Sequence, residues 1–122
     1  MQKILIVDDE IEIANLLKKK LEEHKYAVST VSGGRAALIA CKENKPDLLL
    51  LDIIMPEVDG YEVCKTLKKD PATRDIPVLF LTGKDMQPEG IIELYNKLGA
   101  RGYISKPATI EEILKKVKGI LG

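Results

Sequence analysis

Five residues of the types that handle phosphate or metal ions each follow a short apolar run: Asp8, Asp9, Asp52, Thr82 and Lys106. If those runs are strands of one parallel sheet, their carboxyl ends meet at one edge, which is where ligands bind in open α/β sheets. Two carboxylates about 4 Å apart repel by roughly 4 kcal/mol at an effective dielectric near 20, so the cluster needs positive charge. Carboxylate ligands with open water positions suit Mg²⁺, and a lysine supplies the rest of the charge.

Asp52 has the strongest positional argument, because it closes a run of four leucines. The run does not alternate apolar with polar residues, which is typical of a strand buried on both faces of a parallel sheet. Pro46 and Pro56 flank the run and leave too little length for a buried helix. A carboxylate at the end of such a strand is a site candidate from its position alone.

The remaining chain alternates between strand-like and helix-like segments. Strands are expected over 3–7, 26–31, 48–52, 76–81 and 101–105, and helices over 10–24, 35–43, 59–69, 88–99 and 110–121. In the first helix, Ile13, Leu17 and Leu21 recur every four positions and predict its buried face. This alternation predicts an α/β fold with a parallel sheet and helices on both faces. Right-handed crossovers limit the strand orders without choosing one.

Length and charge exclude several classes of protein. The chain has 122 residues, enough for one domain, and 19 basic against 19 acidic side chains. Balanced charge gives no electrostatic reason for direct nucleic-acid binding or for binding to an anionic membrane. The apolar runs are too short for membrane insertion, and Met1 begins a strand rather than a signal peptide.

The cysteine and histidine content points away from zinc sites and hydrolases. Cys41 and Cys64 lie in helix-like patterns without paired metal motifs, so we expect half-buried, reduced thiols in a cytoplasmic protein. His24, the single histidine, falls near the end of the first helix, where we expect it to be solvated. No histidine is therefore placed to act as a general base at a strand end.

Taken in order, these motifs resemble the receiver domain of two-component response regulators, and the resemblance covers essentially all of residues 1–122. It is carried by Asp8-Asp9, Asp52 with Met55-Pro56 and Asp59-Gly60, Leu81-Thr82-Gly83, and Gly99-Ala100 leading to Gly102-Tyr103-Ile104-Ser105-Lys106-Pro107. It implies a flavodoxin-like (βα)5 three-layer sandwich with a five-stranded parallel sheet of order 2-1-3-4-5. It also implies a usual cis peptide at Lys106-Pro107.

The resemblance implies a phosphoacceptor role for Asp52, whose carboxylate would attack a phosphohistidine. The donor would be a sensor histidine kinase or a histidine phosphotransfer protein. Lys106 and Thr82 would contact phosphoryl oxygens, and Gly83 would leave its backbone N–H accessible to them. An ionised carboxylate is already the nucleophile, so no base is required.

The same resemblance implies a Mg²⁺ site. Asp9, Asp52 and the backbone carbonyl of Ile54 would hold the ion, and Asp8 would act through a bound water. Ile54 and Lys84 flank the expected path of a hydrolytic water, and neither can position it. We therefore expect slow self-dephosphorylation, and no enzymatic turnover of an external substrate.

Phosphorylation is expected to act as a switch. Thr82 would move toward the phosphoryl group, and Tyr103 would rotate inward into the vacated space. The face made by the fourth helix, fifth strand and fifth helix would then bind a downstream protein target differently. The chain would be a monomer or a phosphorylation-dependent dimer, and its target and kinase are not specified by the sequence.

Each assignment has a simpler alternative. Asp8 or Asp9 could be helix caps, Thr82 a turn hydroxyl, Lys106 a surface lysine, and Tyr103 static core packing. Two other functions remain open: a pseudo-receiver that binds partners without phosphorylation, and an aspartyl-phosphate phosphatase of the haloacid dehalogenase type. The phosphatases typically carry a second aspartate two positions after the first, where this chain has isoleucine. A flavodoxin-type FMN binder lacks support, since no Ser/Thr/Gly-rich loop follows the first strand.

Overall fold

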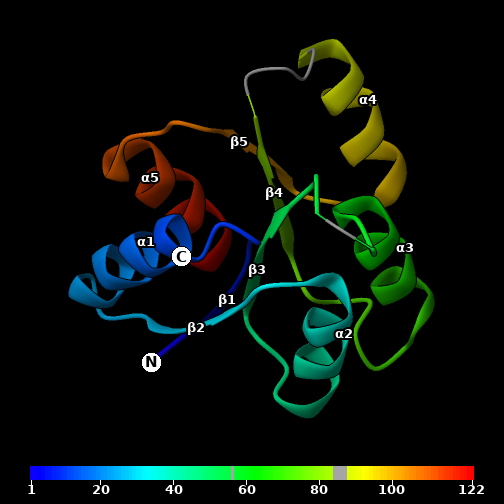
Figure 1. Ribbon diagram of the computed structural model, residues 1–122, viewed down its shortest axis with the longest axis horizontal. Helices are drawn as coiled ribbons and strands as arrows, with labels where there is room; N and C mark the ends of the chain where they lie inside the picture. Colours follow the sequence, from blue (N-terminus) through cyan, green and yellow to red (C-terminus); the bar gives the residue numbers. More distant parts are fainter. Residues whose placement is uncertain (56, 84–87) are drawn as a thin grey trace.

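The computed structural model describes residues 1–55, 57–83 and 88–122, and strands alternate with helices along the chain (Figure 1). The strands are β1 (Lys3–Val7), β2 (Ala27–Val31), β3 (Leu48–Asp52), β4 (Val78–Thr82) and β5 (Gly102–Ser105). The helices are α1 (Ile11–Glu23), α2 (Gly34–Glu43), α3 (Gly60–Lys69), α4 (Pro88–Leu98) and α5 (Ile110–Leu121). All strand pairs are parallel and the order is β2-β1-β3-β4-β5, which confirms the predicted flavodoxin-like topology.

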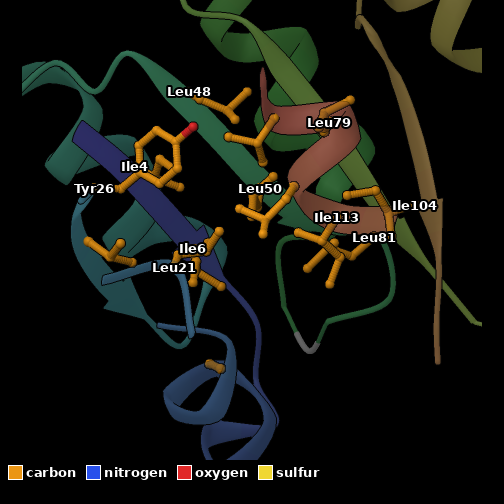
Figure 2. Packing of buried hydrophobic residues seen from close by; sticks show 14 residues of the cluster. Ile4, Ile6, Leu21, Tyr26, Leu48, Leu50, Leu79, Leu81, Ile104 and Ile113 are labelled. Carbon is orange, nitrogen blue, oxygen red and sulfur yellow. The ribbon is translucent and has the colours of Figure 1, made fainter. Parts of the chain in front are cut away.

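Helices cover both faces of the sheet, with α1 and α5 on one side and α2, α3 and α4 on the other (Figure 1). Successive side chains of a strand point to opposite faces, so each apolar strand contributes to two cores. Leu48 and Leu50 pack in the cluster under α1 and α5, part of which Figure 2 shows. Leu49 and Leu51 pack in the cluster under the other helices. The unbroken leucine run is therefore explained by burial on both faces.

The predicted buried face of α1 was wrong at one position. Ile13 is 43% exposed, whereas Ala14 and Leu21 are buried and Leu17 is partly buried against the same core. The period-four pattern found Leu17 and Leu21 correctly. The pattern placed Ile13 on the buried face because isoleucine is more apolar than alanine. In the structure, the neighbouring Ala14 is the buried residue.

Both boundaries of the fourth strand differ from prediction, and the second and fifth strands each begin one residue later than expected. The fourth strand begins at Val78 rather than at Ile76, because the Ile76 N–H is used in a turn with the Thr73 carbonyl (3.1 Å). Proline at 77 has no N–H to offer a ladder. The strand extends to Thr82, which pairs in register with Ser105 of β5.

Both cysteines are more deeply buried than expected. Cys41 of α2 and Cys64 of α3 are 0% exposed and lie in the same core cluster. Burial raises the pKa of Cys41 to about 11 and raises that of Cys64 as well, so both thiols stay protonated near neutral pH. Within the described ranges, no helix is long and apolar enough to span a membrane.

The start of α3 is held tightly against the end of β3. Asp59 caps α3, as predicted, by accepting a hydrogen bond from the Glu62 N–H at 3.0 Å. The Gly60 N–H donates to the Ile53 carbonyl at 2.8 Å. A Cβ on Gly60 would lie 2.3 Å from the Asp52 carbonyl oxygen, too close for any side chain. Glycine is required here because helix and strand backbones touch directly behind Asp52.

Substituting Gly60→Ala is therefore expected to push the backbone of Asp52 out of place. We predict a loss of about 1–3 kcal/mol in the free energy of unfolding, the usual cost of overpacking, measured by urea denaturation. Gly119→Ala is the matched control, because a Cβ there would meet nothing within 4 Å. Equal effects of the two substitutions would contradict this account of Gly60.

Candidate functional site

The chemistry-bearing side chains gather where β1, β3 and β5 end, and strand periodicity explains why. Residues two apart on a strand share a face, so Asp8 continues the face of Ile6, and Asp52 that of Leu50. Lys106 likewise continues the face of Ile104. All three therefore emerge on the side covered by α1 and α5.

Lys106 is the centre of this cluster. Its ammonium Nζ lies 3.1 Å from Asp8 Oδ2 and 3.6 Å from Asp52 Oδ2. Asp8 is 1% exposed and Asp52 6%, so neither carboxylate is well solvated. Asp8 is further held by accepting the Glu10 backbone N–H on Oδ1 at 3.0 Å. The structure thus brings the predicted acceptor, one predicted acid and the predicted lysine into direct contact.

The negative charge at Asp52 is not fully neutralised by its neighbours. Burial and repulsion from Asp8 raise its pKa to about 7, although the attraction of Lys106 acts in the opposite direction. Repulsion from Asp9 adds to the rise. Burial alone would lower the pKa of Lys106, but contacts with Asp8, Asp52 and Glu10 raise it, so the lysine stays charged. One ammonium does not neutralise the cluster, and a divalent cation would relieve the remaining repulsion.

The carboxylates are spaced to bind such a cation. Among the described residues, the acids close enough to share one ion are Asp8, Glu10 and Asp52, which each offer an oxygen within 4.8 Å of the others. These hard oxygen donors fit Mg²⁺. Sequence reasoning did not single out Glu10, although it directly follows the Asp8-Asp9 pair. Asp9 is exposed and lies outside this group, so its role as a ligand stays a prediction.

Thr82 lies beside the cluster but on the opposite face of the sheet. It is 1% exposed, and its hydroxyl donates to the Ile104 carbonyl of β5 at 3.4 Å. The Thr82 carbonyl in turn accepts the Lys106 backbone N–H at 2.7 Å. A Cβ on Gly83 would meet nothing within 4 Å, so space is open at the predicted phosphoryl-binding position.

Tyr103 is half-buried on the face of α3 and α4. Its ring lies 6.0 Å from that of Tyr95, centroid to centroid, at an angle of 39°. Lys116 of α5 places Nζ 5.8 Å from the Tyr103 centroid. These contacts hold the ring partly outside the core. They do not distinguish a switch from static packing, so the switch role stays a prediction.

The structure describes some of the remaining predicted positions. Ile54 is 67% exposed, which places its side chain in solvent two residues beyond Asp52. Lys84 and Pro56 lie outside the described residues. The Lys106–Pro107 peptide is cis, as predicted.

Comparison with known proteins identifies the class to which this fold and site belong. Residues 4–118 match the family described as "Response regulator receiver domain", and the chain belongs to this family. It is 42% identical over 120 residues to the alkaline phosphatase synthesis transcriptional regulatory protein PhoP of Bacillus subtilis (strain 168), covering 98% of this chain and 48% of that protein. It is 38% identical to the response regulator PleD of Caulobacter vibrioides, covering 97% of this chain and 26% of that protein.

Solved structures of response regulators have the same fold as this chain. A putative response regulator from Chloroflexus aurantiacus superposes with a TM-score of 0.90 at 34% identity, covering 98% of this chain and 97% of that one. The chemotaxis protein CheY4 of Vibrio cholerae gives 0.90 at 30% identity, covering 98% of both chains. The chain spans about half or less of the length of the curated relatives named above. This is the receiver domain of a two-component response regulator, and receiver domains generally bind Mg²⁺ and interact with histidine kinases or phosphotransfer proteins.

The raised pKa of Asp52 makes a prediction about stability. The folded pKa (about 7) exceeds the ordinary value of 3.8, so folding binds a proton between those values. The resulting destabilisation is absent below pH 3.8, grows as pH rises and is complete above pH 7. In EDTA, Asp52→Asn should raise the free energy of unfolding by about 1–3 kcal/mol at pH 8, and the gain should shrink steadily toward pH 4.

Urea unfolding at several pH values checks this. Asp75→Asn is the control, because Asp75 is exposed in a loop away from the site. A gain for Asp52→Asn that did not vary with pH would contradict the assignment of unrelieved charge to this carboxylate.

Proposed function

We propose that this chain is a phosphoryl-accepting signalling switch, with Asp52 as the acceptor. The observation that carries the proposal is the buried Asp52 carboxylate, 3.6 Å from the Lys106 ammonium and beside Asp8 at the end of the central strand. A nucleophile must be ionised, and a pKa near 7 leaves Asp52 only partly so. Positive charge supplied at the site would both ionise it and offset charge on the incoming group.

We infer the reaction from the types and positions of these side chains. A carboxylate oxygen of Asp52 forms a bond to phosphorus as the P–N bond of a phosphohistidine breaks, and the histidine is released. The acids Asp8, Asp9 and Asp52, with the Ile54 carbonyl, would hold Mg²⁺, which would supply positive charge to offset that of the phosphoryl oxygens. Lys106 needs only a small movement to leave Asp52 and pair with a phosphoryl oxygen. Hydrolysis of the acyl phosphate is slow, and the chain has no external substrate.

The same geometry supports the switch. The Thr82 hydroxyl bonds to the Ile104 carbonyl at 3.4 Å, a long contact that a phosphoryl oxygen would replace with a stronger, charge-assisted bond. Gly83 would present its N–H to the same group. Movement of Thr82 would free space for Tyr103, which lies half-buried beside Tyr95. The surface of α4, β5 and α5 would then change for a downstream protein target or a second copy of the chain.

The approach to Asp52 favours a protein donor. An apolar groove of about 660 Å³ runs between α1 and α5 and ends at Lys106. Ile13 and Leu16 line it from α1, and both are well exposed. We infer that the sensor kinase or histidine phosphotransfer protein covers this apolar surface while presenting its phosphohistidine at the rim. Regulators such as PhoP of Bacillus subtilis are transcriptional, and a comparable output in a longer protein would lie outside this chain.

Incubation with Mg²⁺ and acetyl phosphate tests the proposal. The intact mass should rise by one phosphoryl group in the parent and in Asp75→Asn, but not in Asp52→Asn. Removing Mg²⁺ with EDTA should abolish the gain. A protein that gains no mass under any condition is a pseudo-receiver, and continuous release of phosphate without a stable adduct indicates a phosphatase; both results reject the proposal.

The lifetime of the acyl phosphate should depend on residue 54. The exposed Ile54 side chain cannot hold a water in line for attack, whereas an amide can. Ile54→Asn should speed decay by about tenfold, less than a positioned acid or base contributes because an amide only orients the water. Phosphoryl loss is followed by intact mass after the phosphodonor is removed. Ile54→Leu, which adds no polar group, should decay like the parent, and equal decay of all three would contradict the idea.

A further inference from the structure

Glu10 holds an unusual position for a carboxylate at the start of a helix. It is the N-cap residue of α1, yet its side chain makes no capping hydrogen bond to the helix. A carboxylate near a helix N-terminus is stabilised by the positive end of the helix dipole. Instead, Glu10 Oε1 lies 3.5 Å from Lys106 Nζ. The Glu10 backbone N–H donates to Asp8 Oδ1 at 3.0 Å, which holds the backbone of Glu10 beside the buried pair.

Lys106 is therefore shared among three carboxylates that differ in burial. Asp8 and Asp52 are buried, whereas the Glu10 side chain is 58% exposed at the rim. Within the part of the chain that the structure describes, no other carboxylate lies within 4.0 Å of the Lys106 ammonium. Among the described residues, Glu10 is thus the one acid outside the buried pair that contacts the ammonium.

A divalent cation and the Lys106 ammonium compete for the same carboxylates. Asp8 and Asp52, which both contact Lys106, belong to the group of acids spaced to share one ion. Two cations this close repel each other, so the ammonium must withdraw when an ion enters. The Glu10 carboxylate, 3.5 Å from Lys106 Nζ, is the partner to which the ammonium can withdraw.

We propose that Glu10 is a positioning residue that holds the Lys106 ammonium at the rim of the site while Mg²⁺ occupies Asp8 and Asp52. The proposal rests on the function proposed above and adds a residue to it. Glu10 acts through Lys106 rather than as a ligand of the ion. It lowers the repulsion between the two cations and keeps the ammonium close enough to reach a phosphoryl oxygen afterwards.

The test is Mg²⁺ affinity of the unphosphorylated chain, measured by calorimetry at fixed ionic strength and pH 8. Glu10→Gln should weaken binding by about threefold to fivefold, the scale of a partly exposed ion pair. Glu12→Gln is the matched control: Glu12 is an exposed acid of the first turn of α1, two residues away, and its loss should leave affinity nearly unchanged.

A double-mutant cycle separates action through Lys106 from action on the ion. In a Lys106→Met background, the loss caused by Glu10→Gln should fall below about twofold, because the group that Glu10 holds is gone. Glu10→Asp, which keeps the charge, should restore part of the affinity in the parent background.

Each other outcome decides against the proposal. Unchanged affinity in Glu10→Gln would show that Glu10 has no role in binding. An equal loss with and without the lysine would make Glu10 a direct partner of the ion. A parent chain that binds no Mg²⁺ would reject the proposed function itself, whereas the first two results leave that function intact.

Discussion

The ion contact between Lys106 and the buried pair Asp8 and Asp52 is the interaction on which the site depends. Two carboxylates at the apolar rim of a sheet would otherwise take up protons, because burial and mutual repulsion both disfavour their charge. The single ammonium keeps them together but does not balance them, as the raised pKa of Asp52 shows. The site is therefore held in a state that gains stability from added positive charge. A divalent cation bound at these carboxylates would complete the neutralisation.

Because side chains alternate along each strand, the predicted site residues lie on two different faces of the sheet. Asp8, Asp52 and Lys106 emerge on the side of α1 and α5, while Thr82 and Tyr103 belong to the other side. The two sides are joined at the rim, where the Lys106 N–H donates to the Thr82 carbonyl at 2.7 Å. This hydrogen bond is a direct backbone link at the rim between the Lys106 side of the site and Thr82.

Much of the fold and part of the site could be predicted from the sequence. The leucine run with flanking prolines identified the central strand, and the alternation of strands and helices identified the class of fold. Strand order came from the family resemblance, since hydrophobic pattern alone does not order parallel strands. Asp52 and Lys106 could be identified because the end of a strand can be recognised from the order of residues along the chain alone.

What the sequence could not supply depends on side-chain direction and on contacts between distant segments. Glu10 was missed because its carboxylate turns from its own helix toward Lys106, 96 residues away. Ile13 was misassigned because a small shift in the helical phase exchanges it with Ala14 at the core. The need for glycine at position 60 depends on how closely α3 approaches the end of β3, a distance that no local pattern records.

The depth of the two thiols has a practical consequence. Cys41 and Cys64 are 0% exposed, and burial raises the pKa of both, so alkylating reagents will react with them slowly in the folded chain. A cysteine introduced on the surface would be the fast-reacting thiol without removal of the native pair. Spin labels or fluorophores can then be attached at chosen points on either face, and the distances between them can be measured before and after addition of Mg²⁺ and a phosphodonor.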